Sequence, residues 1–267
     1  MRISDAVTVV TGAGGGIGAA LARRFAALGA RTVIVADRDA ATARAVAAEI
    51  NGVPETLDVA DGQAVRAVVD RAIDRFGRID LYCANAGITA EQGLGATDAI
   101  WRRAFDVNVM AHVHAAQAVI PHMVAQGQGH FVATASAAGL LSAPADAPYT
   151  ASKHAAVGFA EWLAISYGPS GVGVSVLCPM GVATPMLMKP LAEGVASARA
   201  VAASGAILSP EQVAEAVSAA VEDGRFLIVP HPEVATFWAK KAANPERWIA
   251  AMQRLVANPP SHREVEA

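Results

Sequence analysis

The sequence has few cysteines, few aromatic residues and no strong excess of either charge. Two of its 267 residues are cysteine, aromatic residues make up 5%, and the formal net charge is −3 with a pI of about 6.2. Because no long basic run occurs, a surface for nucleic acid or an anionic membrane is not expected. No stretch approaches the roughly eighteen apolar residues of a membrane-spanning helix.

Neither the cysteines nor the histidines predict a metal site. Cys83 and Cys178 each lie in an apolar, strand-like run, which indicates buried free thiols rather than a disulfide. No HExxH or CxxC spacing occurs, and His112 and His114 would face different ways on a helix. The N-terminal apolar run is too short for a signal peptide. We expect catalysis without a metal, in a soluble cytoplasmic protein.

The chain does contain short β-branched runs that alternate with longer alanine-rich segments, and 54% of its residues are apolar. The runs are apolar throughout, which is typical of a parallel sheet covered on both faces. They lie at 6–10, 32–36, 54–58, 80–84, 130–135, 173–178 and 225–229. Helical patterns lie at 16–28, 39–50, 61–76, 97–124, 149–168 and 210–222. This order predicts an α/β fold in one domain over 1–267, a doubly wound, Rossmann-like parallel sheet of about seven strands with helices on both faces.

Two segments break the alternation. Residues 185–208 follow the sixth predicted strand and carry Pro, Gly and apolar side chains, so we expect a substrate lid at the carboxyl end of the sheet. The tail, about 231–267, has an apolar stripe at helical spacing. The stripe is formed by Trp248, Ile249, Met252, Leu255 and Val256. It docks on the protein's own surface or a neighbouring subunit, or it forms a wall of the pocket.

A glycine-rich turn, TGAGGGIG at 11–18, follows the first predicted strand. Gly12, Gly16 and Gly18 leave room for backbone to approach a pyrophosphate, and Ile17 lies in the first turn of the next helix. The N–H groups and the positive end of that helix point at the phosphates. Glycine-rich turns are common, but strand, glycines, helix and second strand occur here in the order that a dinucleotide site requires.

Asp37 ends the second predicted strand, where a carboxylate accepts hydrogen bonds from the adenosine ribose. Its neighbour Arg38 is a candidate partner for the 2′-phosphate of NADP. The carboxylate repels that dianion at close range, and no lysine or arginine lies in the glycine loop to offset it. Asp37 is alternatively the N-cap of the next helix, a role that Asp39 can also fill. The sequence predicts NAD as the cofactor.

Tyr149 and Lys153 lie four residues apart in YTASK, in a chain with three tyrosines and four lysines. On a helix this spacing places the phenol and the ammonium on one face, one turn apart. The pair is either an ordinary solvated helix face or a phenol whose proton a nearby cation makes labile.

Together these motifs resemble the short-chain dehydrogenase/reductase family in its compact single-domain form, over about residues 4–229. The remaining matches are Asp58–Val59, ANAG at 84–87, the asparagine of FDVNV, Ser136 and CPMGVATPM at 178–186. The resemblance implies a catalytic quartet of Asn108, Ser136, Tyr149 and Lys153. It also implies further cofactor contacts, with Asp58 and Val59 facing the adenine, Asn85, Ala86 and Gly87 lining the ribose side, and Pro179, Val182 and Thr184 near the nicotinamide, whose carboxamide the last two hold.

Two positions depart from the family pattern. Ala84 stands where members commonly have an asparagine that links strands, which bears on local rigidity. Pro179–Met180–Gly181 stands where they commonly have Pro-Gly, so that Met180 either narrows the space near the nicotinamide or shifts the role of the glycine by one residue.

The quartet suits the transfer of a hydride together with a proton. The pKa of free tyrosine, about 10, must fall by roughly three units for the phenol to act as a base at neutral pH, which takes about 4 kcal/mol. Lys153 and the positive ring of the oxidised cofactor would supply the required charge, and the resemblance implies that Lys153 would also donate to the ribose. Ser136 would donate to the substrate oxygen. Asn108 would hold a water that joins Lys153 to solvent.

The sequence therefore predicts an NAD-dependent oxidoreductase acting on a secondary alcohol or its ketone. Two alternatives remain open, an NADPH-dependent ketone reductase of biosynthesis and a regulator that binds NAD(H) without turnover. Apolar residues beside Ser136 and in the lid indicate a hydrophobic, aromatic or alicyclic substrate, and they are Leu140, Leu141, Met186, Leu187 and Met188. The resemblance also suggests a homo-oligomer, a tetramer or dimer, through helices 97–124 and 149–168.

Overall fold

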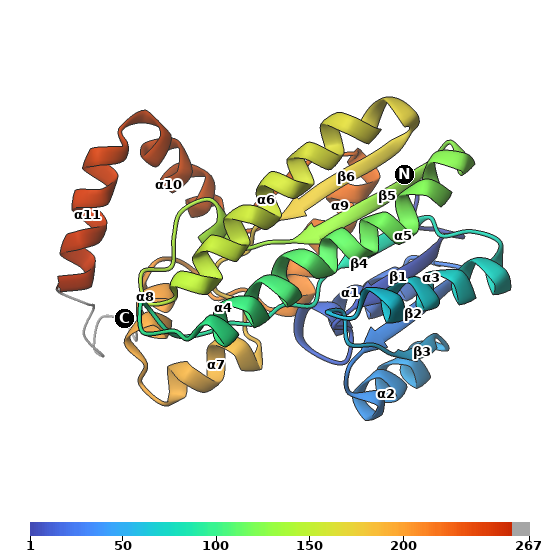
Figure 1. Ribbon diagram of the computed structural model, residues 1–267, viewed down its shortest axis with the longest axis horizontal. Coiled ribbons are helices and arrows are strands. Elements are labelled where there is room, and N and C mark those ends of the chain that lie inside the picture. Colours follow the sequence, from blue (N-terminus) through green and yellow to red (C-terminus); the bar gives the residue numbers. More distant parts are fainter. Residues whose placement is uncertain (258–267) are drawn as a thin grey trace.

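The computed structural model describes residues 1–257, in which strands and helices alternate in the predicted order (Figure 1). The strands are β1 (Val7–Thr11), β2 (Thr32–Asp37), β3 (Val53–Thr56), β4 (Leu81–Ala84), β5 (Gly129–Thr134), β6 (Val172–Leu177) and β7 (Leu227–Ile228). The α-helices are α1 (Gly16–Ala27), α2 (Ala40–Ile50), α3 (Gly62–Phe76), α4 (Asp98–Phe105), α5 (Ala111–Gln126), α6 (Ala147–Tyr167), α7 (Pro185–Ala192), α8 (Ala196–Ala203), α9 (Pro210–Asp223), α10 (Pro232–Ala243) and α11 (Pro245–Ala257).

All seven strands form one parallel sheet in the order β3-β2-β1-β4-β5-β6-β7. This order confirms the predicted doubly wound, Rossmann-like α/β fold. The chain leaves β1 toward β2 on one side of the sheet and continues from β4 on the other. Ligands bind at the carboxyl ends of the strands beside such a reversal. The topology therefore predicts a ligand-binding site at the ends of β1 and β4.

Apolar cores cover both faces of the sheet. On one face α3, α5 and α6 pack on the strands, with Val69, Val119 and Leu163 in the contact. On the other face α1, α2 and α9 pack on the strands, with Leu21 and Val217 in the contact. Strand β3 differs from the expected apolar run, because its exposed and partly buried residues alternate at the edge of the sheet.

The helix predicted over 97–124 is interrupted, which corrects the sequence analysis. Between α4 and α5 lies a five-residue π-helix, η1 (Asp106–Met110). The extra residue in such a turn changes the direction of the side chains that it carries. Asn108, in the middle of η1, is fully buried. The apolar pattern runs on through this region and gives no sign of the insertion.

Helices also shape the two segments that lie outside the alternation. The lid segment, residues 185–208, contains α7 and α8 and returns to the body through a parallel bridge between Val182 and Leu208. In the tail, α11 stands away from the sheet at the left of Figure 1 and has no buried residue. It packs on the protein's own surface, with Trp248 against Phe237 of α10 at 6.1 Å between ring centroids. Residues 258–267 of the predicted tail lie outside the described residues.

Cys83 and Cys178 are buried free thiols, as predicted. Burial raises the pKa of the Cys178 thiol to about 12. None of the helices within residues 1–257 is long and apolar enough to cross a membrane.

Candidate active site

A cavity of about 400 Å³ opens at the carboxyl ends of the strands, lined by residues at or after the ends of β1, β2, β3, β4, β5 and β6. All of the predicted cofactor-binding residues line this cavity, namely Gly12, Gly16, Ile17, Gly18, Asp37, Arg38, Asp58, Val59, Asn85, Ala86, Gly87, Tyr149, Lys153, Pro179, Val182 and Thr184. Ser136 lines it as well. Asn108 is not among the lining residues and lies behind the wall.

The glycine loop has backbone geometry that side chains would disturb. Gly12 has a φ of +63°, and a Cβ there would lie 2.9 Å from the Cα of Ala86. A Cβ on Gly18 would overlap the carbonyl of Gly12. Helix α1 begins at Gly16 with no side-chain cap and no acidic residue in its first turn, so its first N–H groups are available to an anion. These features fit the pyrophosphate of a dinucleotide.

Asp37 ties the glycine loop to the end of β2. Its carboxylate accepts hydrogen bonds from the backbone N–H of Gly14, at 2.9 Å, and of Asp39, at 3.0 Å. Asp39 caps α2 by accepting from the N–H groups of Ala41 and Thr42. The alternative role of Asp37 as the N-cap is therefore wrong, and its carboxylate faces the cavity.

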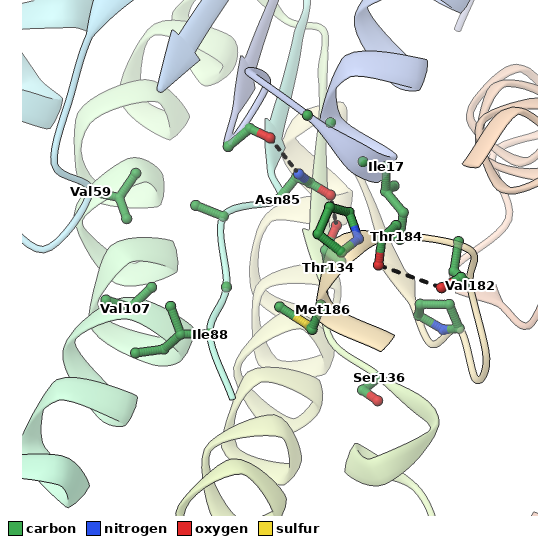
Figure 2. A pocket seen from close by; sticks show the side chains of 18 of the residues that line it. Ile17, Val59, Asn85, Ile88, Val107, Thr134, Ser136, Val182, Thr184 and Met186 are labelled. Carbon is green, nitrogen blue, oxygen red and sulfur yellow. Dashed lines mark hydrogen bonds between the residues drawn. The ribbon is translucent and has the colours of Figure 1, made fainter. Parts of the chain in front are cut away.

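Asn85 joins the ends of three strands, and Figure 2 shows it beside Thr134. Its Nδ2 donates to the carbonyl of Thr11 at 3.0 Å, and its Oδ1 accepts from the hydroxyl of Thr134 at 3.3 Å. Asn85, the residue after Ala84, thus links β4 to β1 and β5 at this point. Ala84 itself is a buried member of the sheet core.

The predicted quartet is brought together by β5, α6 and η1. Lys153 is 2% exposed, and its Nζ donates to the carbonyl of Thr134 at 2.9 Å. The same Nζ lies 5.6 Å from the centre of the Tyr149 ring, one helical turn away on α6. Ser136 follows β5, and its Oγ accepts from the N–H of Ala138 at 3.1 Å. Figure 2 shows Ser136 apart from the Asn85–Thr134 pair.

Asn108, the fourth member of the quartet, lies behind the cavity wall and bonds to Ile88 and Ser152. Its Oδ1 accepts from the N–H of Ile88 at 2.9 Å, and its Nδ2 donates to the Ile88 carbonyl at 3.0 Å and to Ser152 Oγ at 2.9 Å. A Cβ on Gly87 would lie 3.2 Å from Lys153 Nζ and 3.3 Å from Asn108 Oδ1. Gly87 therefore keeps open the space between these two polar groups.

The comparison with known families decides what the chain is. The family described as short chain dehydrogenase matches residues 6–194. The chain belongs to the short-chain dehydrogenase family. The prediction of an oxidoreductase of this family is confirmed.

Individual relatives of this short-chain dehydrogenase cover most of its length. The 1-deoxy-11-beta-hydroxypentalenate dehydrogenase of Streptomyces exfoliatus is 36% identical, over 85% of this chain and 84% of the relative. The cis-4-hydroxycyclohexanecarboxylate dehydrogenase of Sinomonas cyclohexanicum is 33% identical, over 85% of this chain and 93% of the relative. A crystal structure of a short-chain dehydrogenase/reductase from Burkholderia phymatum in complex with NAD is 31% identical and superposes with a TM-score of 0.83, covering 98% of each chain.

The electrostatics of the pair in this short-chain dehydrogenase differ from the expectation. Burial raises the pKa of the Tyr149 phenol, the Ser136 hydroxyl lowers it and the charge of Asp146 raises it. Burial lowers the pKa of Lys153 to about 8. Because burial favours the neutral form of both groups, the chain by itself does not produce the lowered phenol pKa that the spacing of the pair suggests.

Asp146 is a site residue that the sequence analysis missed. It is buried, caps α6 by accepting from the N–H of Tyr149 at 3.0 Å, and accepts from the N–H groups of Ala90 and Glu91 at 2.8 and 2.7 Å. It thereby fixes the loop after β4 against the turn that carries Tyr149. An aspartate followed by a proline in the first helical turn is an N-cap signal, so this residue was open to prediction.

The apolar residues proposed to face the substrate are only partly where the sequence analysis expects them. Met186 and Leu187 line the cavity. Leu140 and Leu141 are instead buried in the core, and Met188 is 42% exposed at the surface. Ile88 and Val107, which the sequence analysis did not name, add apolar surface to the cavity. No group of His, Cys, Asp and Glu side chains suited to a metal ion occurs within residues 1–257.

Proposed function

We propose that this short-chain dehydrogenase transfers a hydride between NAD(H) and a hydrophobic secondary alcohol or its ketone. The observation that carries the proposal is that one cavity is lined by the glycine loop, by Asp37 and by Ser136, Tyr149 and Lys153. The relative solved in complex with NAD supports the cofactor. The test is a screen of aromatic and alicyclic secondary alcohols with NAD, followed by NADH absorbance. A protein that binds NADH but oxidises none of them would instead be the non-catalytic regulator.

The glycine loop and the start of α1 would hold the pyrophosphate, and Asp37 would accept from the adenosine ribose. Bound NAD would supply the hydride acceptor and, in its oxidised form, a positive ring. Tyr149 would take the proton of the alcohol at its phenol oxygen while Ser136 donates to the same substrate oxygen. Lys153, held by the Thr134 carbonyl, would donate to the ribose and favour the phenolate.

Asn108 would position this machinery rather than touch the substrate. Its three hydrogen bonds join Ile88, in the cavity wall, to Ser152 beside Lys153. Its Oδ1 accepts one of these bonds and keeps a second lone pair. That acceptor is where the predicted water between Lys153 and solvent would bind.

The substrate would lie beneath the lid segment. Met186 and Leu187 on α7, with Ile88 and Val107, give this part of the cavity an apolar lining. The name of the relative from Sinomonas cyclohexanicum denotes an alicyclic hydroxy acid, in agreement with an alicyclic alcohol here. One domain over the whole chain and a cytoplasmic location stay predictions.

Replacing Asp37 with serine is expected to change the cofactor preference. The ratio of kcat/KM with NAD to that with NADP should fall by about a hundredfold, because the ribose acceptor and the repulsion of a 2′-phosphate are both lost beside Arg38. Initial rates with the two cofactors measure this ratio. Asp39→Ser is the matched control, since Asp39 does not line the cavity and serine still caps α2. A wild-type preference for NADPH would identify the alternative ketone reductase.

The outer faces of η1, α5 and α6 favour self-association. They expose large apolar side chains, namely Met110 at 40%, Val124 at 38%, Trp162 at 54% and Ile165 at 72%. Exposed apolar patches of this kind mark interaction sites, and a second copy of the chain is the proposed partner. The wild type should sediment as a dimer or tetramer.

Trp162→Glu combined with Ile165→Glu is expected to shift the sedimentation coefficient toward that of a monomer, because two charges would be desolvated in the interface. Leu94→Glu, at a side chain 98% exposed in a loop, is the control that should leave association unchanged. A wild type that sediments as a monomer contradicts the proposed interface.

A further inference from the structure

His231, at the start of α10, connects the tail to the cavity wall. The imidazole is 1% exposed. Its Nδ1 lies 3.2 Å from the backbone N of Met180, and its Nε2 lies 2.9 Å from the carbonyl oxygen of Gly181. Because Nδ1 faces an N–H donor and Nε2 faces a carbonyl, the proton belongs on Nε2. A neutral imidazole therefore satisfies both sides of the Met180–Gly181 turn.

This turn belongs to the wall that lines the cavity after β6. Pro179, Met180, Val182 and Thr184 all line the cavity. The Pro179 carbonyl accepts from the N–H of Ala137 at 2.8 Å, next to Ser136. The position of the wall is thus coupled to the turn that carries a proposed catalytic hydroxyl.

Other hydrogen bonds hold the wall at Gly181 and Ala183, whereas the backbone N–H of Met180 donates to His231. The Gly181 carbonyl also accepts from the N–H of Leu208, and the Leu208 carbonyl accepts from the N–H of Ala183. The side chain of Met180 packs close to Gly205. A Cβ placed on Gly205 would lie 2.7 Å from Cε of Met180. His231 thus gives the backbone N–H of Met180 a buried acceptor.

A second contact from α10 reaches the chain that follows Ser136. Lys241 Nζ donates to the carbonyls of Leu140 and Leu141 at 2.7 and 2.9 Å. Helix α10 thereby holds both the wall after β6 and the chain that follows Ser136. Residues 231–243 lie beyond residues 6–194, the part of the chain that the family model matches.

We propose that His231 is a positioning residue for the nicotinamide end of the cavity, acting through the Met180–Gly181 turn. The inference rests on the proposed function, in which Val182 and Thr184 hold the carboxamide. Loss of His231 would leave the partly buried N–H of Met180 without its acceptor and would free the wall to move. Binding of the adenosine half, at Asp37 and the glycine loop, would be unaffected.

The test compares His231→Leu with His130→Leu. His130 is the matched control because it is also a buried imidazole, 2% exposed and 2.8 Å from Ser175 Oγ, but lies at the amino end of β5, away from the cavity. Two probes report on binding, NADH and ADP-ribose, of which only NADH has the nicotinamide ring. For His231→Leu we expect a Kd for NADH about tenfold higher, an unchanged Kd for ADP-ribose and a kcat lower by about tenfold to a hundredfold. His130→Leu should change none of the three.

The two Kd measurements distinguish a failure of the role of His231 from a failure of the proposed function. A wild type that binds NADH more tightly than ADP-ribose but oxidises no alcohol would refute the proposed function, while the effect of His231→Leu on NADH would still stand. Equal effects of the two variants on both probes would overturn the role of His231. If His231→Leu does not fold, His231→Asn and His231→Gln replace it, because each amide can keep one of the two hydrogen bonds. Wild-type binding and kcat in both of these variants would equally overturn the role.

Discussion

Tyr149→Phe is expected to lower kcat for alcohol oxidation by about a thousandfold or more, with a Kd for NADH within about twofold of the wild type. Phenylalanine keeps the ring that packs beside Lys153 and removes only the oxygen that would take the proton. The N-cap of α6 is unaffected, because Asp146 bonds to the backbone N–H of residue 149 and not to the phenol. The variant should therefore fold and bind cofactor.

Turnover at saturating NAD and NADH binding by fluorescence titration measure the two quantities separately. Tyr167→Phe, at the last residue of the same helix and outside the cavity, is the matched control and should retain wild-type turnover. If Tyr149→Phe kept the turnover of a verified substrate, the phenol would not be the proton acceptor.

Acidification from pH 7 to pH 5 is expected to lower the free energy of unfolding by about 4 kcal/mol through two buried histidines. Burial, assisted by the charge of Lys153, lowers the pKa of His112 to about 3. Burial, assisted by the charge of the N-terminal amine, lowers the pKa of His130 to about 4. Above a pH of about 6.5, the pKa of histidine in the unfolded chain, both histidines are neutral in the folded and the unfolded protein. Their ionisation then favours neither state.

As the pH falls below that value, the unfolded chain binds protons that the folded chain does not, so stability is lost until the folded pKa values are reached. Each histidine accounts for about 2 kcal/mol of the loss between pH 7 and pH 5. Urea unfolding at a series of pH values in this range measures it.

His130→Leu provides the internal comparison for this effect. The change in unfolding free energy between pH 7 and pH 5 should be about 2 kcal/mol smaller in the variant than in the wild type, whatever the variant's stability at pH 7. An identical pH dependence in the two proteins would show that His130 is not buried as a neutral group.

The parts of the fold that follow from local pattern could be read from the sequence. Apolar runs such as TVIVA and HFVATA are buried on both faces, so they identify strands of a covered parallel sheet. Parallel strands all end at one edge of the sheet, which places Asp37 and Ser136 at the same cavity although they are far apart in the chain. Site residues attached to strand ends are therefore predictable.

Residues that depend on contacts between distant segments could not be read in this way. His231 bonds to a turn fifty residues earlier, and Lys241 bonds to a carbonyl 101 residues earlier. The π-helix at Asn108 leaves the apolar pattern unchanged, and the bonds that Asn108 makes there go to Ile88 and Ser152, which are distant in the chain. The burial of Leu140 shows the same limit, since an apolar side chain in a loop does not reveal what it packs against.

In the proposed reaction, one cavity brings the carbinol carbon of an alcohol to the nicotinamide while Tyr149 takes the hydroxyl proton. The most direct test uses the best alcohol from the screen, labelled with deuterium at its carbinol carbon, and mass spectrometry of the cofactor after reaction with NAD. We expect the NADH formed to carry one deuterium for each ketone produced. Cofactor that stays oxidised, or NADH without the label, would contradict it.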